Sequence, residues 1–152
     1  MSETDLIYIA GFFDGEGCIT IDAWKSRKRQ QFALRVRINN NDLEILTFIK
    51  NILGGSICIA SRANEKHKTY KTCYAWAVAC CSASRVLQKL LPYLKHTKKQ
   101  ALLALEFQEL IQRGKFRGEK RLTDEELQKR QEIKQKISYL NKLCERSKRR
   151  SV

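Results

Sequence analysis

Residues 6–17 read Leu-Ile-Tyr-Ile-Ala-Gly-Phe-Phe-Asp-Gly-Glu-Gly, and the predicted arrangement of the chain depends on this stretch. Apolar side chains crowd its first two turns, which predicts a helix with Ser2 or Thr4 capping its start. The helix is expected to break at Gly15 and at the glycine that follows Glu16. Its small residues would let a second backbone approach closely. Packing this helix against a copy of itself would therefore place two acids side by side at its lower end.

The residues after this helix alternate between apolar and polar side chains, as a half-buried β-strand does. One strand is predicted over 18–25 and a second, with clearer alternation, over 32–38. The connecting turn over 25–29 is basic. The two strands would form a hairpin that buries one face and exposes a polar, basic one, and such a ribbon fits the major groove of DNA. Arginines that decorate a solvated face are the alternative, which explains the basic turn less well.

The elements that follow are predicted from the same periodicities and from capping signals. They are a helix over 43–53 capped by Asp42 and stopped by Gly54 and Gly55, strands over 56–60 and 72–81, and a helix that opens at Ser82 or Ser84 and ends at Pro92. Thr97 is placed to cap the next helix, over 98–112. Its expected buried side holds Ala101, Leu102, Leu105, Leu110 and Ile111.

A capping box over 123–126 predicts one last helix, which ends near Cys144. Its apolar stripe is thin and its other faces are charged. We therefore expect it to pack at the edge of the domain or to follow a phosphate backbone. The basic residues after it are expected to form a flexible arm that adds nonspecific affinity.

The composition bounds the class of protein. The chain has 152 residues, with 30 lysines and arginines against 16 aspartates and glutamates, which gives a formal net charge of +14. A surplus of this size favours a polyanionic partner, since each neutralised phosphate releases counterions. A basic protein that is simply soluble is the alternative. At this length, one domain with a substantial core is expected.

Targeting and metal signals are few. No apolar run approaches the ~18 residues that a membrane span needs, and the pattern of a secretory signal is lacking. The six cysteines lack paired metal-binding spacing, and Cys80 and Cys81 are adjacent. We therefore expect reduced cysteines in an intracellular protein that has no membrane partner.

Residues 9–17 resemble the motif that names the LAGLIDADG homing endonucleases. Gly11, Asp14 and two further glycines coincide with that motif, and Glu16 takes the place of its last acid. The predicted order of elements is similar to the family as well, so the resemblance covers most of the chain. A helix that runs through a DGEG turn into a strand, as in many domains, is the alternative.

The resemblance implies an α+β fold of the order αββαββα, with an antiparallel β-saddle that sits on DNA and with additional C-terminal helices. We expect a single domain over 1–152, with its core at about 4–113, a C-terminal helix at 123–145 and a basic tail at 146–152.

The activity implied is that of a homing endonuclease, which makes a double-strand break in a long, near-palindromic DNA target. Its expected metal ion is Mg²⁺, with Mn²⁺ or Ca²⁺ as other ions that would fit, and Glu16 is the expected ligand. One carboxylate per chain is too few for a hard ion, so the single motif implies a homodimer. Asp14 is expected to brace the helix ends rather than bind metal. The expected dimer interface consists of Leu6, Ile9, Ala10, Gly11, Phe13 and Asp14.

Two further catalytic roles come from the resemblance, each with a departure. The family's water-positioning glutamine falls on Asn40, with Asn39 as the fallback if the turn is shifted by one. A role in the turn, which asparagine favours, is the alternative for Asn40. In the gapless register the family's active-site lysine falls on Thr97, so either Lys98 or Lys95 supplies the charge or the site works without it. The expected catalytic set is Glu16, Asn40 and Lys98.

Base recognition is expected from outward-facing residues of the strands and their turns. Arginine can bond a guanine edge bidentately, whereas lysines in turns anchor phosphates. The expected DNA-binding residues are Thr20, Asp22, Trp24, Lys28, Arg29, Arg35, Arg37, Arg62 and Lys71.

Two other functions fit the same sequence. The first is a protein of this fold that binds nucleic acid without cutting it, as an RNA-splicing maturase or a DNA-binding regulator. The second is a generic basic α/β domain that binds RNA or the ribosome, with neither a helix-mediated dimer nor metal dependence. For the endonuclease, the expected compartment is an organelle (chloroplast or mitochondrion) or a prokaryotic cytoplasm.

Overall fold

The structure, a computed structural model, describes residues 2–26, 29–61, 71–116 and 123–150. The αββαββα order is confirmed, with two additional C-terminal helices, and so is the α+β class. In chain order, the elements are α1 (Glu3–Glu16), β1 (Gly17–Ser26), β2 (Arg29–Asn40), α2 (Leu43–Leu53), β3 (Ser56–Ser61), β4 (Cys73–Ala79), α3 (Cys80–Leu90), α4 (Lys98–Phe116) and α5 (Asp124–Arg150).

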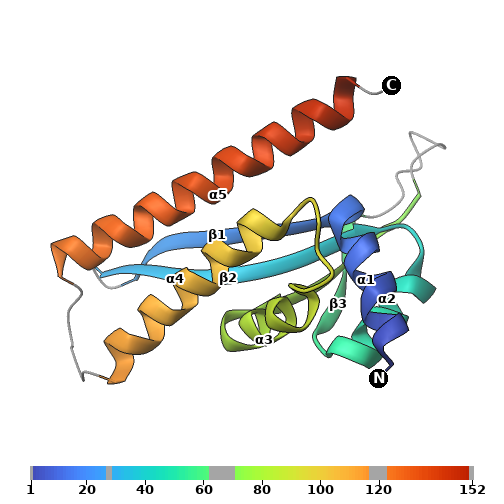
Figure 1. The fold of residues 1–152 in the computed structure, drawn as a ribbon, viewed down its shortest axis with the longest axis horizontal. Helices are drawn as coiled ribbons and strands as arrows, with labels where there is room; N and C mark the ends of the chain where they lie inside the picture. The colour runs from blue at the N-terminus through green and yellow to red at the C-terminus, as the bar shows by residue number, and fades with distance from the viewer. Residues whose placement is uncertain (1, 27–28, 62–70, 117–122, 151–152) are drawn as a thin grey trace.

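One antiparallel sheet, with strand order β1-β2-β4-β3, carries the fold. The hairpin of β1 and β2 is its longest part, and it pairs Gly17 with Ile38 at the end far from its turn. Helices α3 and α4 lie across one face of the sheet, and α5 runs beside the edge strand β1 (Figure 1). At the Gly17 end, α1 and α2 lie next to one another, with the rings of Tyr8 and Phe48 in edge-to-face contact.

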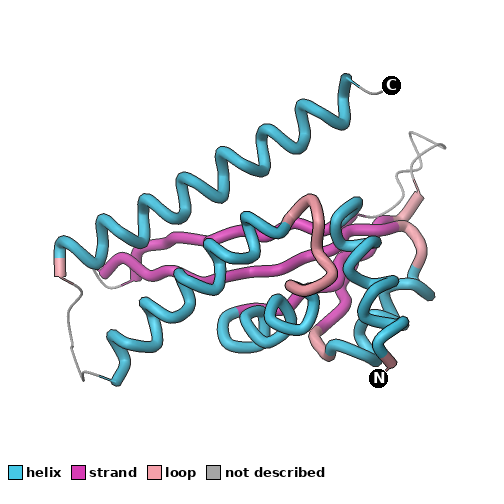
Figure 2. Tube along the Cα trace, in the orientation of Figure 1, coloured by secondary structure: helices cyan, strands magenta, loops and turns pink. Residues whose placement is uncertain are grey.

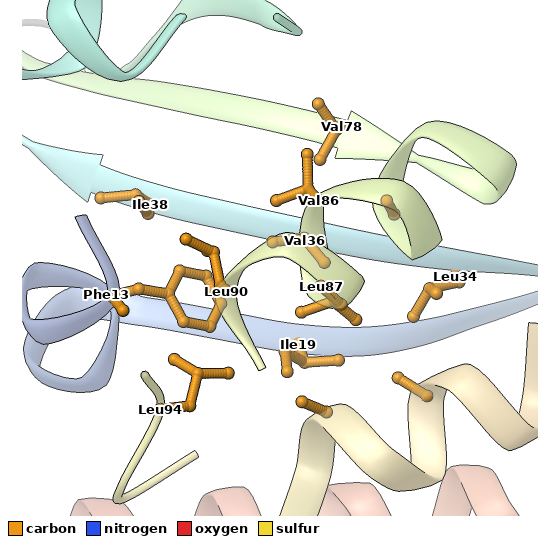
Figure 3. Packing of buried hydrophobic residues seen from close by; sticks show 14 of the residues in the cluster. Phe13, Ile19, Leu34, Val36, Ile38, Val78, Val86, Leu87, Leu90 and Leu94 are labelled. Atoms are coloured by element: carbon orange, nitrogen blue, oxygen red, sulfur yellow. The ribbon is translucent and has the colours of Figure 1, made fainter. Parts of the chain in front are cut away.

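The core lies between the sheet and these helices. Alternate residues of the hairpin, Ile19, Leu34 and Val36, point toward Leu87 and Leu90 of α3 (Figure 3). All five side chains are at most 1% exposed. Burying an apolar side chain of this size contributes roughly 1.5–3 kcal/mol. The alternation in the two strands therefore sets which face meets the helices, and the predicted inward face is confirmed.

Side-chain caps begin α1 and α2. The hydroxyl of Ser2 accepts the backbone N–H of Asp5, while the carboxylate of Asp5 accepts the N–H of Ser2. This reciprocal pair is a capping box, and it makes Ser2 the cap rather than Thr4. Asp42 caps α2 as predicted, because its carboxylate accepts the N–H of Glu44 at 2.8 Å.

The helix at the motif is longer than predicted. Gly15 does not break it, because helical hydrogen bonding continues through this glycine to Glu16. The helix ends at Gly17, where a Cβ atom would overlap the ring of Phe13. That ring points inward, beside Leu90 (Figure 3). Close packing of a buried phenylalanine, rather than backbone freedom, therefore demands a glycine at the start of β1.

The predicted start of α3 is wrong. Strand β4 ends at Ala79 and α3 begins at Cys80, before the expected Ser82 or Ser84. Cys80 has a φ angle of 52°, so the backbone itself turns the chain from strand into helix. The helix accordingly has no side-chain cap.

Other boundaries and faces also differ from the predictions. Strand β1 extends to Ser26 and β2 starts at Arg29, so the turn expected over 25–29 is shorter, and residues 27–28 lie outside the described part. Leu102 is 50% exposed instead of buried, because the inner side of α4 is made by residues with a spacing of three, Ala101, Ala104 and Phe107.

The basic arm expected after Cys144 is instead helical as far as the structure describes it. Helix α5 continues to Arg150, since neither glycine nor proline interrupts residues 124–150. Residues 151–152 of the expected tail lie outside the described part.

Candidate active site and nucleic-acid interface

Glu16 occupies the junction between α1 and β1. It is the last residue of the helix, and its side chain is exposed. Among the described residues, no hydrogen bond or ion pair holds its carboxylate. A solvent-facing carboxylate at a rigid helix end is free to accept a cation from outside the chain.

Asn39 and Asn40 lie at the same end of the sheet as Glu16. Because Gly17 pairs with Ile38, the last two residues of β2 extend past the start of β1, alongside the end of α1. The amide oxygen of Asn40 accepts the backbone N–H of Asp42 at 2.8 Å. The turn role of Asn40 is therefore real, and the amide nitrogen is the end that remains to hold a water molecule.

The carboxylate of Asp14 joins α1 to the segment that precedes α4. Its Oδ2 accepts the backbone N–H groups of Lys95 and His96, at 2.7 and 3.1 Å. Its Oδ1 accepts both the N–H and the hydroxyl of Thr97, at 2.8 and 2.7 Å. This is the bracing role expected for Asp14.

The same hydrogen bonds keep Asp14 ionised. Partial burial by itself raises the pKa of this carboxyl, but the hydroxyl of Thr97 and the three backbone N–H groups outweigh it. The pKa of Asp14 therefore lies below its ordinary value, and a charged brace is maintained at neutral pH.

Lys98 directly follows the segment that this brace holds. It is the first residue of α4 and it is exposed, directly after a Thr97 that is only 6% exposed. Since the hydroxyl of Thr97 is bonded to Asp14, this side chain points into the brace and away from solvent. The end of α1 that carries Glu16 is therefore joined to β2 by the pairing of Gly17 with Ile38, and to the residue before Lys98 by the Asp14 brace. Lys95 is exposed nearby and remains the alternative cation.

The described residues of a single chain supply an incomplete set of metal ligands. Within the described ranges, no group of three or more His, Cys, Asp or Glu residues is placed to hold a metal ion. Mg²⁺ takes about six oxygen ligands and usually keeps several waters. One exposed carboxylate fits such an ion only if a second chain and phosphate oxygens complete the set.

The outer face of the sheet, opposite the helices, carries the predicted base-reading side chains of the hairpin. Trp24 is 48% exposed and Arg37 is exposed on this face. Arg35 bonds diagonally across the strands to Asp22, with Nε and Oδ2 3.1 Å apart and both side chains about 40% exposed. Thr20 is half-buried in the same row, opposite Arg35. Among the described side chains of this face, Arg35 is ion-paired and Arg37 is not.

Of the other expected DNA-binding residues, only some are described. Lys71 is exposed, just before β4. Arg29 begins β2, but its side chain is not described, and Lys28 and Arg62 lie outside the described residues.

The expected dimer interface needs a correction. Ile9, Ala10 and Phe13 are 0% exposed and belong to the core of their own chain, so they have no surface to offer a second copy. Leu6 and Asp14 are half-buried, which leaves Gly11 as the exposed member of the expected set.

Another face of α1 is available to a partner. Ile7 and Tyr8 are 50% and 56% exposed, and they share this side of the helix with Gly11 and Gly15. A Cβ atom at either glycine would meet nothing within 4 Å in the same chain. We call these four residues the outer face of α1. Helical spacing could have shown this face, but the apolar residues all round the helix obscured which side meets the core.

Comparison with known proteins agrees with this fold. Residues 9–110 match the family model for the LAGLIDADG endonuclease, whereas no curated protein matches the chain. The homing endonuclease I-CvuI in complex with the I-CreI target is 23% identical, with a TM-score of 0.72 over 91% of this chain and 82% of that one.

Two further solved structures share the fold. The archaeal intron-encoded homing endonuclease I-Vdi141I complexed with DNA is 18% identical, with a TM-score of 0.72 over 91% of this chain and 84% of that one. I-SmaMI bound to an uncleaved DNA target is 21% identical, with a TM-score of 0.63 over 87% of this chain and 44% of that one. No helix of the described ranges is long and apolar enough to cross a membrane.

Proposed function

The chain belongs to the LAGLIDADG endonuclease family, and we propose that it is a homing endonuclease that cuts both strands of a specific DNA site. The observation that carries the proposal is Glu16. It is an exposed carboxylate, without a partner among the described residues, where the motif helix meets the hairpin whose outer face carries Arg37 and Trp24.

We infer that the active form is a homodimer built on the outer face of α1. Two glycines on that face let two helices approach closely, and Ile7 and Tyr8 supply apolar surface at its other end. Dimerisation would bring the two Glu16 carboxylates together, one for each DNA strand. A two-fold dimer implies a near-palindromic target with one half-site per chain.

The chemistry divides among a few side chains. A divalent ion such as Mg²⁺, held by the two Glu16 carboxylates and by phosphate oxygens, would supply Lewis-acid stabilisation of the scissile phosphate. Asn40 holds and orients the attacking water through its amide nitrogen, since its amide oxygen is committed to the turn. Lys98 places a positive charge near the phosphate as negative charge develops on it.

DNA is bound by the outer face of the sheet. The hairpin is a two-stranded ribbon, which the major groove admits. Arg37 and Trp24 are exposed on it, and Arg35 is oriented by Asp22. The net charge of +14 supplies the nonspecific part of the affinity, which should fall steeply with salt.

The test is incubation with a library of randomised double-stranded DNA in Mg²⁺, followed by sequencing of the cut ends. The wild-type protein should enrich one long, near-palindromic sequence among them. The Glu16→Gln variant should bind the same sequence and leave it intact. A wild-type protein that selects a DNA site but never cuts it would instead identify a binding protein of this fold.

A further inference from the structure

The segment between α3 and α4 is tied to both ends of α1. We call residues 93–97 the strap, and Figure 2 shows this loop beside the helix. The hydroxyl of Tyr93 donates to Glu3 at 3.0 Å, near the start of α1. Leu94 is 1% exposed and packs near Phe13 (Figure 3). Asp14 then holds the other end of the strap.

Asp14 uses both of its oxygens in this contact. Oδ1 and Oδ2 each accept two hydrogen bonds, and three of the four donors are consecutive backbone N–H groups of the strap. Donors of this kind precede a helix and have no partner within it. With four bonds already made, this carboxylate has little capacity left for a metal ion. Asp14 is therefore built to fix a backbone.

The position of Asp14 connects the two ends of the candidate site. Glu16 follows it by two residues along the same helix, and Lys98 follows Thr97 by one residue at the start of α4. One carboxylate thus sets where the acid-bearing helix end lies relative to the first turn of the cation-bearing helix. A lysine has a long, flexible stem, so the placement of its backbone decides which phosphate its ammonium can reach.

We propose that Asp14 is a positioning residue, which places the ammonium of Lys98 against the DNA phosphate beside Glu16. The inference rests on the proposed function and names an additional residue for it. Asp14 itself touches neither the DNA nor the metal ion; it acts through the strap. It follows that the threonine at position 97 belongs to the brace, and that the cation of the site comes from the next residue.

A double-mutant cycle tests this coupling. We would prepare Asp14→Asn, Lys98→Met and the double variant, and measure single-turnover cleavage at saturating protein in Mg²⁺ and the DNA dissociation constant in Ca²⁺. Misplacement of a catalytic group can cost about 100-fold. Each single variant should therefore cut about 10- to 100-fold more slowly than the wild-type protein. The double variant should cut no more slowly than the slower of the two single variants.

Matched controls separate positioning from general damage. Asp5→Asn removes a hydrogen-bonded carboxylate from the opposite end of α1, and Lys99→Met removes the neighbouring exposed charge on α4. Neither should be coupled to Asp14→Asn. If Asp14→Asn fails to fold, Thr97→Val takes its place, since it deletes only the 2.7 Å hydroxyl bond, and Thr97→Ser should restore the rate.

Additive effects of Asp14→Asn and Lys98→Met on both the cleavage rate and the dissociation constant would overturn the inference. Cleavage by Asp14→Asn at the wild-type rate would overturn it as well. If the wild-type protein binds DNA without cutting, the proposed function fails separately. The cycle measured on the dissociation constant then decides the positioning role: non-additive losses support it and additive losses refute it.

Discussion

The hydroxyl of Thr97 donates to the carboxylate of Asp14 over 2.7 Å, across 83 positions of the sequence. This bond joins the end of the motif helix to the start of α4, and it is largely shielded from water because Thr97 is 6% exposed. A hydrogen bond to a charged group contributes about 1.5–3 kcal/mol. The contact between these two residues therefore supports the fold as well as the site.

Replacing Thr97 by valine should lower the free energy of unfolding by about 1–3 kcal/mol, because the shape is kept while the hydroxyl donor is lost. Urea denaturation followed by circular dichroism measures the change. Thr97→Ser keeps the donor and should lose less. Equal stability of the valine variant and the wild-type protein would show that the hydroxyl bond adds nothing to folding.

Replacing Gly11 by alanine should separate folding from dimerisation. A methyl group at this position meets nothing within 4 Å in its own chain, and alanine is better than glycine in a helix by about 1 kcal/mol. The isolated chain should not be destabilised. The dissociation constant of the dimer should rise, because the added methyl group keeps the two helices from approaching closely. Sedimentation equilibrium measures the dimer. Gln88→Ala, on an exposed position of α3, is the control and should leave dimerisation unchanged.

Replacing Arg37 by alanine should weaken specific DNA binding by about 1–3 kcal/mol and relax the base preference at one position of each half-site. The reason is that Arg37 is exposed on the outer face of the sheet and has no ion-pair partner among the described residues. Binding to a panel of single-base variants of the selected target measures both effects. Lys89→Ala, on α3 across the other face, removes the same charge and should leave base preference intact. Equal preference in both variants would place the reading surface elsewhere.

Ionisation of Tyr93 should occur above the ordinary pKa of tyrosine. Its hydroxyl donates to Glu3, and burial and the negative charge of Glu3 add to the effect, so the pKa of Tyr93 is raised. The folded state thus favours the neutral phenol. This stabilisation is present below the unfolded pKa of ~10 and is lost as the pH rises through the folded-state value. The difference in tyrosinate absorbance between the wild-type protein and Tyr93→Phe isolates this group, and Glu3→Gln should move its midpoint back toward the ordinary value.

The strands and most helices were predictable because their signals are local. Alternation in the hairpin placed Ile19 and Val36 inward and Arg37 outward, since successive side chains of a strand point to opposite faces. Capping chemistry at Asp42 depends on residues that are neighbours in the sequence. Such patterns predict structure from residues that are close together in the sequence.

The surface of the motif helix could not be assigned in the same way. This helix is apolar on nearly all sides, because one side meets its own core and the other side carries exposed apolar side chains, Ile7 and Tyr8. Periodicity therefore could not show that Phe13 faces inward and Tyr8 outward. The brace between Asp14 and Thr97 was hidden for a different reason. It joins two segments that are far apart in the sequence, and the local pattern suggested only that Thr97 caps a helix.

The role of Glu16 in cutting DNA is tested by the rate of double-strand cleavage of the selected target, measured for the wild-type protein and for Glu16→Gln in Mg²⁺. The DNA dissociation constant of each protein is measured alongside in Ca²⁺. We expect the wild-type protein to break both strands, whereas Glu16→Gln should bind the target with similar affinity and cut neither strand at a measurable rate. Equal cleavage by the two proteins, or specific binding without any cleavage by the wild-type protein, would contradict this expectation.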